Sequence, residues 1–138
     1  MNRVDLQRLS RMRAQEAKAL LDAGYFAGSY YLMGYSVECA IKAAIAKRTQ
    51  RYDFPDKQLA LDSFKHDLPS LLQTARLRPT LDAAMTASVP LRENWAVVKD
   101  WSEITRYEPA TAESKARDFY SACTARTHGI LAWLKTYW

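Results

Sequence analysis

Cysteine and histidine are scarce in this sequence, which narrows the chemistry open to the chain. The 138 residues include two cysteines and two histidines. Cys39 and Cys123 form no CxxC pair and belong to no paired cysteine and histidine spacing of the kind that binds zinc. We therefore expect two reduced, buried thiols, as is typical of cytoplasmic proteins. We also expect no metal and no other cofactor.

Long apolar runs are missing too. No stretch reaches 18 uninterrupted apolar residues, and charged residues are spread through the N-terminal segment. We therefore expect neither a membrane span nor a signal peptide, and we expect the protein to be cytoplasmic. No segment alternates apolar and polar residues with a period of two for long enough to form a strand. The sequence thus predicts an all-α protein with one domain over residues 1–138.

The common motifs of enzyme active sites are absent as well. The sequence has no glycine-rich phosphate loop, no HExxH segment and no nucleophile elbow. The net charge of +5 permits contact with phosphate groups but does not require it. Composition and motifs therefore indicate a helical protein without indicating a reaction.

The clearest helical pattern lies between Gly28 and Lys47. One apolar row recurs at intervals of three and four and predicts a buried face. Its members are Tyr30, Met33, Val37, Ile41 and Ala44. A neighbouring row places two phenols, a carboxylate and an ammonium group on one strip of the helix. Its members are Tyr31, Tyr35, Glu38 and Lys42. Gly34 and the alanines keep this helix slim, so another helix can pack closely against it.

Breakers and caps divide the rest of the chain. The short junction after Gly24 predicts an antiparallel hairpin of the first two helices. Asp67 is expected to cap a third helix, and Pro90 to interrupt or kink a later one. The expected helices cover 1–23, 28–47, 67–78, 79–101 and 112 nearly to the C-terminus, with loops at 49–65 and 102–112. This pattern predicts a four-helix up-and-down bundle with an additional short helix.

The first helix carries an arginine-rich surface and an apolar face. Its cations suit either a strip that binds nucleic acid or an ordinary solvated face, and acidic residues interrupt them. The cations are Arg3, Arg8, Arg11, Arg13 and Lys18. The apolar face is expected to include Val4, Leu6, Leu9, Met12, Ala17, Leu20 and Leu21.

Six residues are candidates for a functional site that binds a nucleotide, RNA or a protein partner. They are Tyr35, Glu38, Lys42, His66, Arg106 and Tyr107. Glu38 and Lys42 are four residues apart in the order that favours a plain surface ion pair. His66 stands just before the third helix, where a histidine caps, packs or transfers protons. Arg106 has the fork geometry to hold a phosphate, and it can equally cap a helix end. No catalytic residue is assigned.

Several segments together resemble the HEPN domain family (higher eukaryotes and prokaryotes nucleotide-binding). Residues 23–42, AGYFAGSYYLMGYSVECAIK, resemble the family's second helix. Residues 64–72, FKHDLPSLL, resemble its H-D-L-x-x-L element, and residues 101–107, WSEITRY, its W-x-x-x-x-R-Y element. The last helix, which ends in LAWLK, also fits, so the likeness covers most of residues 4–136.

The resemblance implies a four-helix up-and-down bundle that forms a homodimer in a bacterial or archaeal cytoplasm. Small proteins of this kind are commonly encoded beside a minimal nucleotidyltransferase, as a toxin–antitoxin or related pair.

Many HEPN domains are metal-independent ribonucleases with an Arg-x4–6-His motif near the start of the last helix. The motif is absent here. The histidine that follows Arg117 is His128, eleven residues on, which is about 16 Å along a helix. Arg126 lies only two residues before His128.

Three functions therefore stay open. The first is a module that binds a nucleotide, an RNA or a nucleotidyltransferase. This reading further predicts that Arg106 shares a pocket with the Tyr35, Glu38 and Lys42 strip, with Glu38 holding Arg106 either as part of a site or as a structural clasp. The second is a ribonuclease with a displaced site, in which His66 or His128 is the general acid or base. The third is a non-catalytic dimeric helical scaffold.

Overall fold

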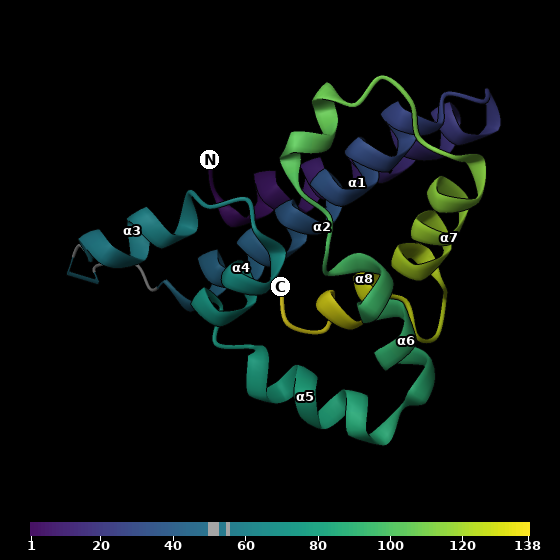
Figure 1. Cartoon of the computed structure of the whole chain (residues 1–138). Coiled ribbons are helices and arrows are strands. Elements are labelled where there is room, and N and C mark those ends of the chain that lie inside the picture. The colour runs from purple at the N-terminus through teal and green to yellow at the C-terminus, as the bar shows by residue number, and fades with distance from the viewer. Residues whose placement is uncertain (50–52, 55) are drawn as a thin grey trace.

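The structure is a computed structural model that describes residues 1–49, 53–54 and 56–138, and within those residues it is all-α, as predicted (Figure 1). The elements in chain order are α1 (Arg3–Asp22), α2 (Phe26–Arg48), α3 (Lys57–Ser63), α4 (Leu68–Thr74), α5 (Arg78–Ala87), α6 (Val89–Val98), the 3-10 helix η1 (Glu103–Tyr107), α7 (Glu113–Thr124) and α8 (Ile130–Leu134). The expected up-and-down arrangement of four main helices is not confirmed by this set of shorter helices. No helix in the described part of the chain is long and apolar enough to cross a membrane.

Helices α1 and α2 form the predicted antiparallel hairpin and lie along one another (Figure 1). Their contact is made by small residues with reciprocal hydrogen bonds. The Ser10 Oγ donates to the Ser36 carbonyl at 2.8 Å, and the Ser36 Oγ donates to the Ser10 carbonyl at 2.7 Å. The Ser29 Oγ donates to the carbonyl of Ala17 at 2.8 Å. These bonds satisfy buried hydroxyls and allow the two backbones to approach closely.

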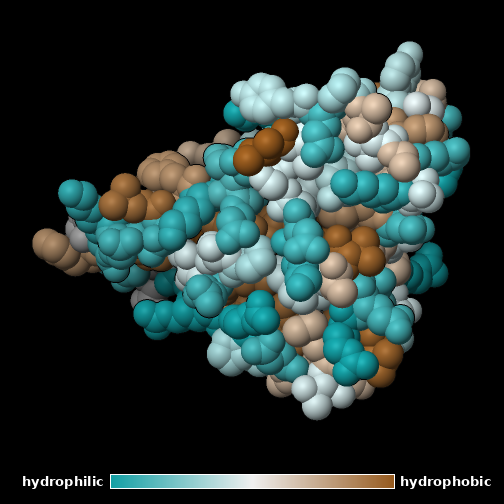
Figure 2. Space-filling model, viewed as in Figure 1, coloured by the Kyte–Doolittle hydropathy of each residue, from teal (hydrophilic) through white to brown (hydrophobic). Residues whose placement is uncertain are grey.

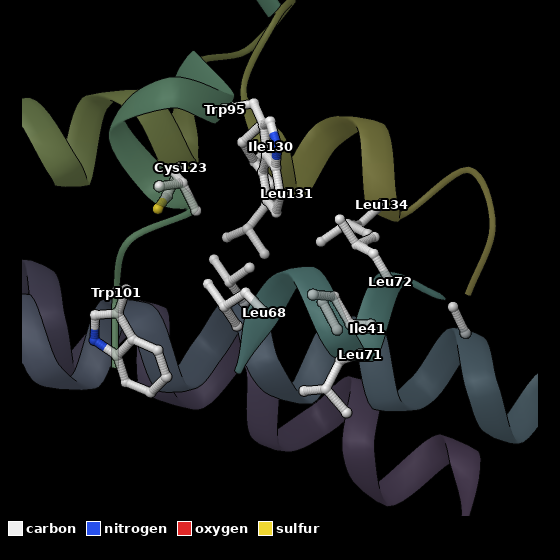
Figure 3. Close-up of a cluster of buried hydrophobic side chains, with 14 of the residues drawn as sticks. Ile41, Leu68, Leu71, Leu72, Trp95, Trp101, Cys123, Ile130, Leu131 and Leu134 are labelled. Atoms are coloured by element: carbon white, nitrogen blue, oxygen red, sulfur yellow. The ribbon is translucent and has the colours of Figure 1, made fainter. Parts of the chain in front are cut away.

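The core surrounds the predicted apolar row of α2. All five residues of that row are at most 5 % exposed. Figure 3 shows Ile41 of α2 together with Leu68 and Leu72 of α4, near Leu131 and Leu134 of α8. Helices α4, α7 and α8 each contact α2, so α2 is the central element of the core.

Trp101 packs directly on the slim part of α2. A Cβ atom built on Gly34 would lie 2.0 Å from the Trp101 ring, so a glycine at this position is what admits the indole. Trp101 is 2 % exposed. This contact brings the start of the 102–112 segment onto the middle of α2.

Both segments predicted as loops contain helical turns. Residues 57–63 form α3, because the Asp56 side chain accepts the backbone N–H of Leu59 at 3.1 Å and so caps a helix. Residues 103–107 form η1, where the Ser102 Oγ accepts the N–H of Ile104 at 3.3 Å. The expectation of unbroken loops was wrong at these two places. Residues 50–52 and 55 of the first predicted loop lie outside the described residues.

The last helix is split, contrary to the continuous helix predicted from residue 112. Helix α7 ends at Thr124, and α8 begins at Ile130. The turn between them brings the backbone of Gly129 so close to Ala125 that a Cβ atom at position 129 would lie 2.3 Å from the Ala125 carbonyl oxygen. The sequence periodicity continues across this turn, so it did not reveal the break.

The helix cap and the helix interruption that were predicted from a polar residue and a proline are both confirmed. Asp67 caps α4 as predicted, and its side chain accepts the N–H of Ser70. The predicted interruption at Pro90 is confirmed, because α5 ends at Ala87 and Ser88 caps α6. On α1 the apolar face is narrower than predicted, since Val4 is 69 % and Met12 44 % exposed.

Candidate functional site

Four side chains from two segments form a continuous surface that we call the tyrosine–arginine strip: Tyr107 and Arg106 of η1, and Tyr31 and Tyr35 of α2. The Tyr31 and Tyr35 rings are one helical turn apart and stack with centroids 6.4 Å apart. The Arg106 guanidinium carbon lies 4.8 Å from the centroid of the Tyr107 ring. Tyr107 is 73 % exposed, so this end of the strip faces solvent.

Trp101 and Arg13 pack against the tyrosines of the strip. The Trp101 ring stacks on Tyr31 with centroids 6.2 Å apart. The Arg13 guanidinium of α1 lies 6.0 Å from the Tyr35 ring. The strip is therefore supported by α1, by α2 and by the segment after α6.

The environment of the strip raises the pKa values of two of its members. Hydrogen bonding to Tyr107, and then to Tyr31, raises the pKa of the Arg106 guanidinium. Burial raises the pKa of the Tyr35 phenol, and neighbouring Cys39 and Glu38 raise it further. Both shifts favour a neutral Tyr35 phenol and a charged Arg106 guanidinium at neutral pH.

Glu38 lies one turn beyond Tyr35 and is a buried carboxylate with a 2 % exposed side chain. Its Oε1 accepts hydrogen bonds from the Lys42 Nζ at 2.8 Å and from the His66 Nδ1 at 2.9 Å. Glu38 Oε2 is buried and has no hydrogen-bond partner among the described residues. The predicted surface ion pair therefore has a buried carboxylate, and its lysine is only 19 % exposed.

His66 joins the site from a distant part of the chain. The cap at Asp67 fixes the start of α4, and this directs the preceding His66 side chain to Glu38, 28 residues earlier. A carboxylate accepts hydrogen bonds, so the Nδ1 of His66 must carry the proton. In the neutral ring the Nε2 is then a free base, on a side chain that is 47 % exposed. The arrangement can therefore accept or deliver a proton.

The predicted contact between Arg106 and Glu38 is absent. In the part of the chain that the structure describes, Arg106 interacts with Tyr107 and Tyr31, while Glu38 is paired with Lys42 and His66. Tyr31 and Glu38 are seven residues apart, which places them about 10 Å apart along the helix axis. The idea that Glu38 holds Arg106 is wrong, although both groups lie on one side of α2.

A pocket adjoins the strip where α1, α2 and the end of α3 meet. Its volume is about 380 Å³. Tyr35, Glu38 and Lys42 form its polar part. Its other walls come from Met1, Leu6, Leu9, Cys39, Ile45, Ala46, Thr49, Ser63 and Phe64. Three of the six predicted residues therefore line one pocket, His66 is tied to it through Glu38, and Arg106 and Tyr107 lie at the far end of the strip.

Of the remaining reactive groups, Cys39 is a thiol in the pocket wall and His128 lies elsewhere. Cys39 is unpaired, and burial together with Glu38 raises the pKa of its thiol to about 12, so it is protonated at neutral pH. His128 lies in the turn between α7 and α8, and its Nδ1 is 3.2 Å from the Oγ of Ser88, which caps α6. Within the described residues, no group of three or more histidine, cysteine, aspartate or glutamate side chains is placed to bind a metal ion.

Two members of the arrangement were not among the predicted site residues. Tyr31 could have been predicted from the sequence, because it is four residues from Tyr35 on the same row of the helix. Arg13 could not have been predicted from the sequence, since its contact with Tyr35 depends on how α1 packs on α2. No protein-family model, curated protein or solved structure matches this chain.

Proposed function

We propose that this protein is a HEPN-like module that associates with a nucleotide or RNA and is one half of a pair with a minimal nucleotidyltransferase. In this proposal the chain carries the four-helix up-and-down bundle of that family, acts as a homodimer and works in the cytoplasm. The observation that supports the proposal best is the tyrosine–arginine strip and its continuation into Lys42 and His66.

The chemistry of the strip suits an unpaired nucleic-acid strand. Aromatic rings offer stacking surfaces to bases, and arginine binds both phosphate and aromatic faces. Tyr107 and Arg106 are exposed, while Glu38, the acidic residue of the row, has its charge buried and paired. Arg106 is therefore the cation that a phosphate backbone along the strip would meet, since Arg13 is already paired with Glu16.

RNA binding tests this proposal. The probe is a fluorescently labelled single-stranded RNA, and the readout is anisotropy at several salt concentrations. Arg106→Ala is expected to weaken binding about 5- to 10-fold and to reduce the salt slope by about 1. Arg92→Ala, which removes an exposed arginine from α6, is the matched control and should leave affinity unchanged. Equal effects of the two substitutions, or no binding by the wild-type protein at low salt, would reject the proposal.

A second function, metal-independent RNA cleavage, is favoured by one observation. The bond between Glu38 Oε1 and His66 Nδ1 leaves the other ring nitrogen of His66 as a base beside the strip. In EDTA, the wild-type protein should then cleave single-stranded RNA, and His66→Gln should reduce the rate at least about 100-fold without weakening binding. His128→Gln is the control, because His128 is bound to Ser88 on α6. Binding without cleavage would support the RNA-binding module and exclude the ribonuclease.

The nucleotidyltransferase partner is tested separately. Purification of the untagged protein from its native host, followed by mass spectrometry, should recover a minimal nucleotidyltransferase in stoichiometric amount. A dimer that binds neither RNA nor such a partner would leave the third reading, a helical scaffold.

A further inference from the structure

We propose that the pocket between α1, α2 and the end of α3 holds one unpaired base of the RNA strand that lies on the tyrosine–arginine strip. This inference rests on the proposed function and adds to it a base-binding subsite. The strip would hold the backbone and neighbouring bases, and the pocket would take a single base out of the stack.

The size and walls of the pocket fit a flat ring. Its volume of about 380 Å³ lies in the range of small-ligand pockets. Leu6 and Leu9 of α1 line one side, and Ile45 and Ala46 of α2 line another. Phe64 stands at the end of α3 and is 74 % exposed, so its ring is available for stacking. Apolar walls of this kind favour the faces of a base over a phosphate.

The polar part of the pocket fits the edge of a base. Lys42 and Glu38 form an ion pair at 2.8 Å, so the Lys42 charge is already compensated by a carboxylate. Lys42 uses one N–H on Glu38 and has two more to donate, and Tyr35 brings a hydroxyl to the same part of the pocket. The Lys42 ammonium as donor and the Tyr35 hydroxyl as donor or acceptor match the edge of a nucleobase, where a carbonyl or ring nitrogen lies beside an N–H group.

The pocket and the strip are continuous. Tyr35 lines the pocket, and its ring also stacks on Tyr31 of the strip. A strand that follows the strip from Tyr107 toward Lys42 therefore arrives at the pocket. Its phosphates stay outside, near Arg106, and the next base can enter between Leu9 and Phe64.

The experiment combines pocket-filling variants with abasic RNA. The probes are single strands of about eight nucleotides, within the usual site size of such proteins, with each position made abasic in turn. For the wild-type protein, one abasic position should weaken binding about 5- to 100-fold, the value of one stacked base. Ala46→Trp fills the pocket, so it should weaken binding of the intact strand by a similar factor. It should have no further effect on the strand that lacks the critical base.

Two variants keep the experiment decisive. Ala83→Trp places the same bulky side chain on the exposed face of α5 and should bind RNA like the wild-type protein. If Ala46→Trp loses its helical circular dichroism, Ala46→Leu fills part of the pocket with a good helix former and takes its place.

The outcomes separate this inference from the proposed function. If the wild-type protein binds RNA and Arg106→Ala weakens it, but the pocket-filling variant and the Ala83→Trp control bind equally well, the base subsite is wrong and the strip remains. A protein side chain would then be the better occupant of the pocket. If the wild-type protein binds no RNA, the function and the subsite are both rejected.

Discussion

Glu38 is the residue on which the polar contacts of this protein converge. Its carboxylate is almost fully buried and is shared by Lys42 on its own helix and His66 before α4. Removal of one partner from a buried ion pair leaves an uncompensated charge, which is far more costly than the loss of a surface pair. The single-residue substitutions that test the site most directly therefore act on this carboxylate and its neighbours.

Substitution of Lys42 should lower stability strongly. Lys42→Met keeps the apolar stem of the side chain but leaves Glu38 without its cation, so the free energy of unfolding should fall by about 3 kcal/mol. Lys18→Met is the control, because the Lys18–Asp22 pair has the same spacing with both side chains at least half exposed. That change should cost less than about 1 kcal/mol. Urea unfolding measures both, and equal losses would show that Glu38 does not depend on Lys42.

The Cys39 thiol should make the fold sensitive to alkali. Its pKa is raised from 9.0 to about 12, mainly by burial, so between these values the folded chain keeps a proton that the unfolded chain loses. The thiol makes its full contribution to the free energy of unfolding below about pH 9, and this contribution is lost as the pH rises toward 12. At about pH 10 the loss should be about 1 kcal/mol relative to pH 8.

Cys39→Ala isolates this contribution. Unfolding of the variant should show a smaller decrease between pH 8 and pH 10 than unfolding of the wild-type protein, by about 1 kcal/mol. Contributions of the lysine side chains and of tyrosines other than Tyr35, whose pKa Cys39 also raises, cancel in this difference. An identical pH dependence of the two proteins would mean that the thiol titrates alike in the folded and unfolded chains.

At the scale of elements, helix α2 combines a poor helix former with a close contact. Gly34 costs about 1 kcal/mol of helix propensity relative to alanine. In return it lets Trp101 approach to a distance at which a Cβ atom would overlap the ring. Because Trp101 also stacks on Tyr31, this contact positions the strip as well as the core.

Two glycines of α2 should respond in opposite ways to the same substitution. Gly34→Ala should lower the free energy of unfolding by about 1–3 kcal/mol, since the indole must move. Gly28→Ala should be neutral or stabilising by up to about 1 kcal/mol, because its Cβ would meet only the flexible end of Leu20 at 3.2 Å. Thermal or urea unfolding gives both values. A stabilised Gly34→Ala protein would contradict the Trp101 contact.

At the scale of the whole molecule, apolar side chains gather on the lobe that carries α3. Figure 2 shows brown and tan side chains over this lobe, at the left of the view. Phe54 is 93 % and Leu61 52 % exposed, and neither lines the pocket between α1, α2 and the end of α3. Helix α3 itself has no buried residue. Exposed apolar surface of this kind is typical of interaction sites.

We expect a homodimer that uses this surface. Sedimentation at micromolar concentration should give twice the chain mass of 15.8 kDa. Leu61→Ser should weaken the dimer at least about 10-fold without loss of helix, since residues at the centre of an interface cost more than about 1 kcal/mol when truncated. Val97→Ser, at a 43 % exposed position of α6, is the control. A wild-type monomer at all concentrations would exclude the dimer, and equal effects of the two variants would place its interface elsewhere.

Local chemistry and helical period were enough to predict much of this molecule. The apolar row from Tyr30 to Ala44 is buried, Asp67 caps α4, and the chain breaks before Pro90, as the sequence predicts. Caps and breaks depend on residues a few positions apart, and a buried face depends only on spacing. Both can therefore be read before any distant contact is known. The same period also put Tyr31, Tyr35, Glu38 and Lys42 on one side of α2.

Tertiary structure alone decided the partners of those side chains. Glu38 is paired with His66 rather than Arg106, and Arg106 meets Tyr31 instead. The turn at Gly129 splits a helix whose periodicity is unbroken. Periodicity determines which face of a helix a residue occupies, whereas the opposing residue depends on how segments far apart in the chain pack together. That packing is why the carboxylate expected at the surface became the buried centre of the candidate site.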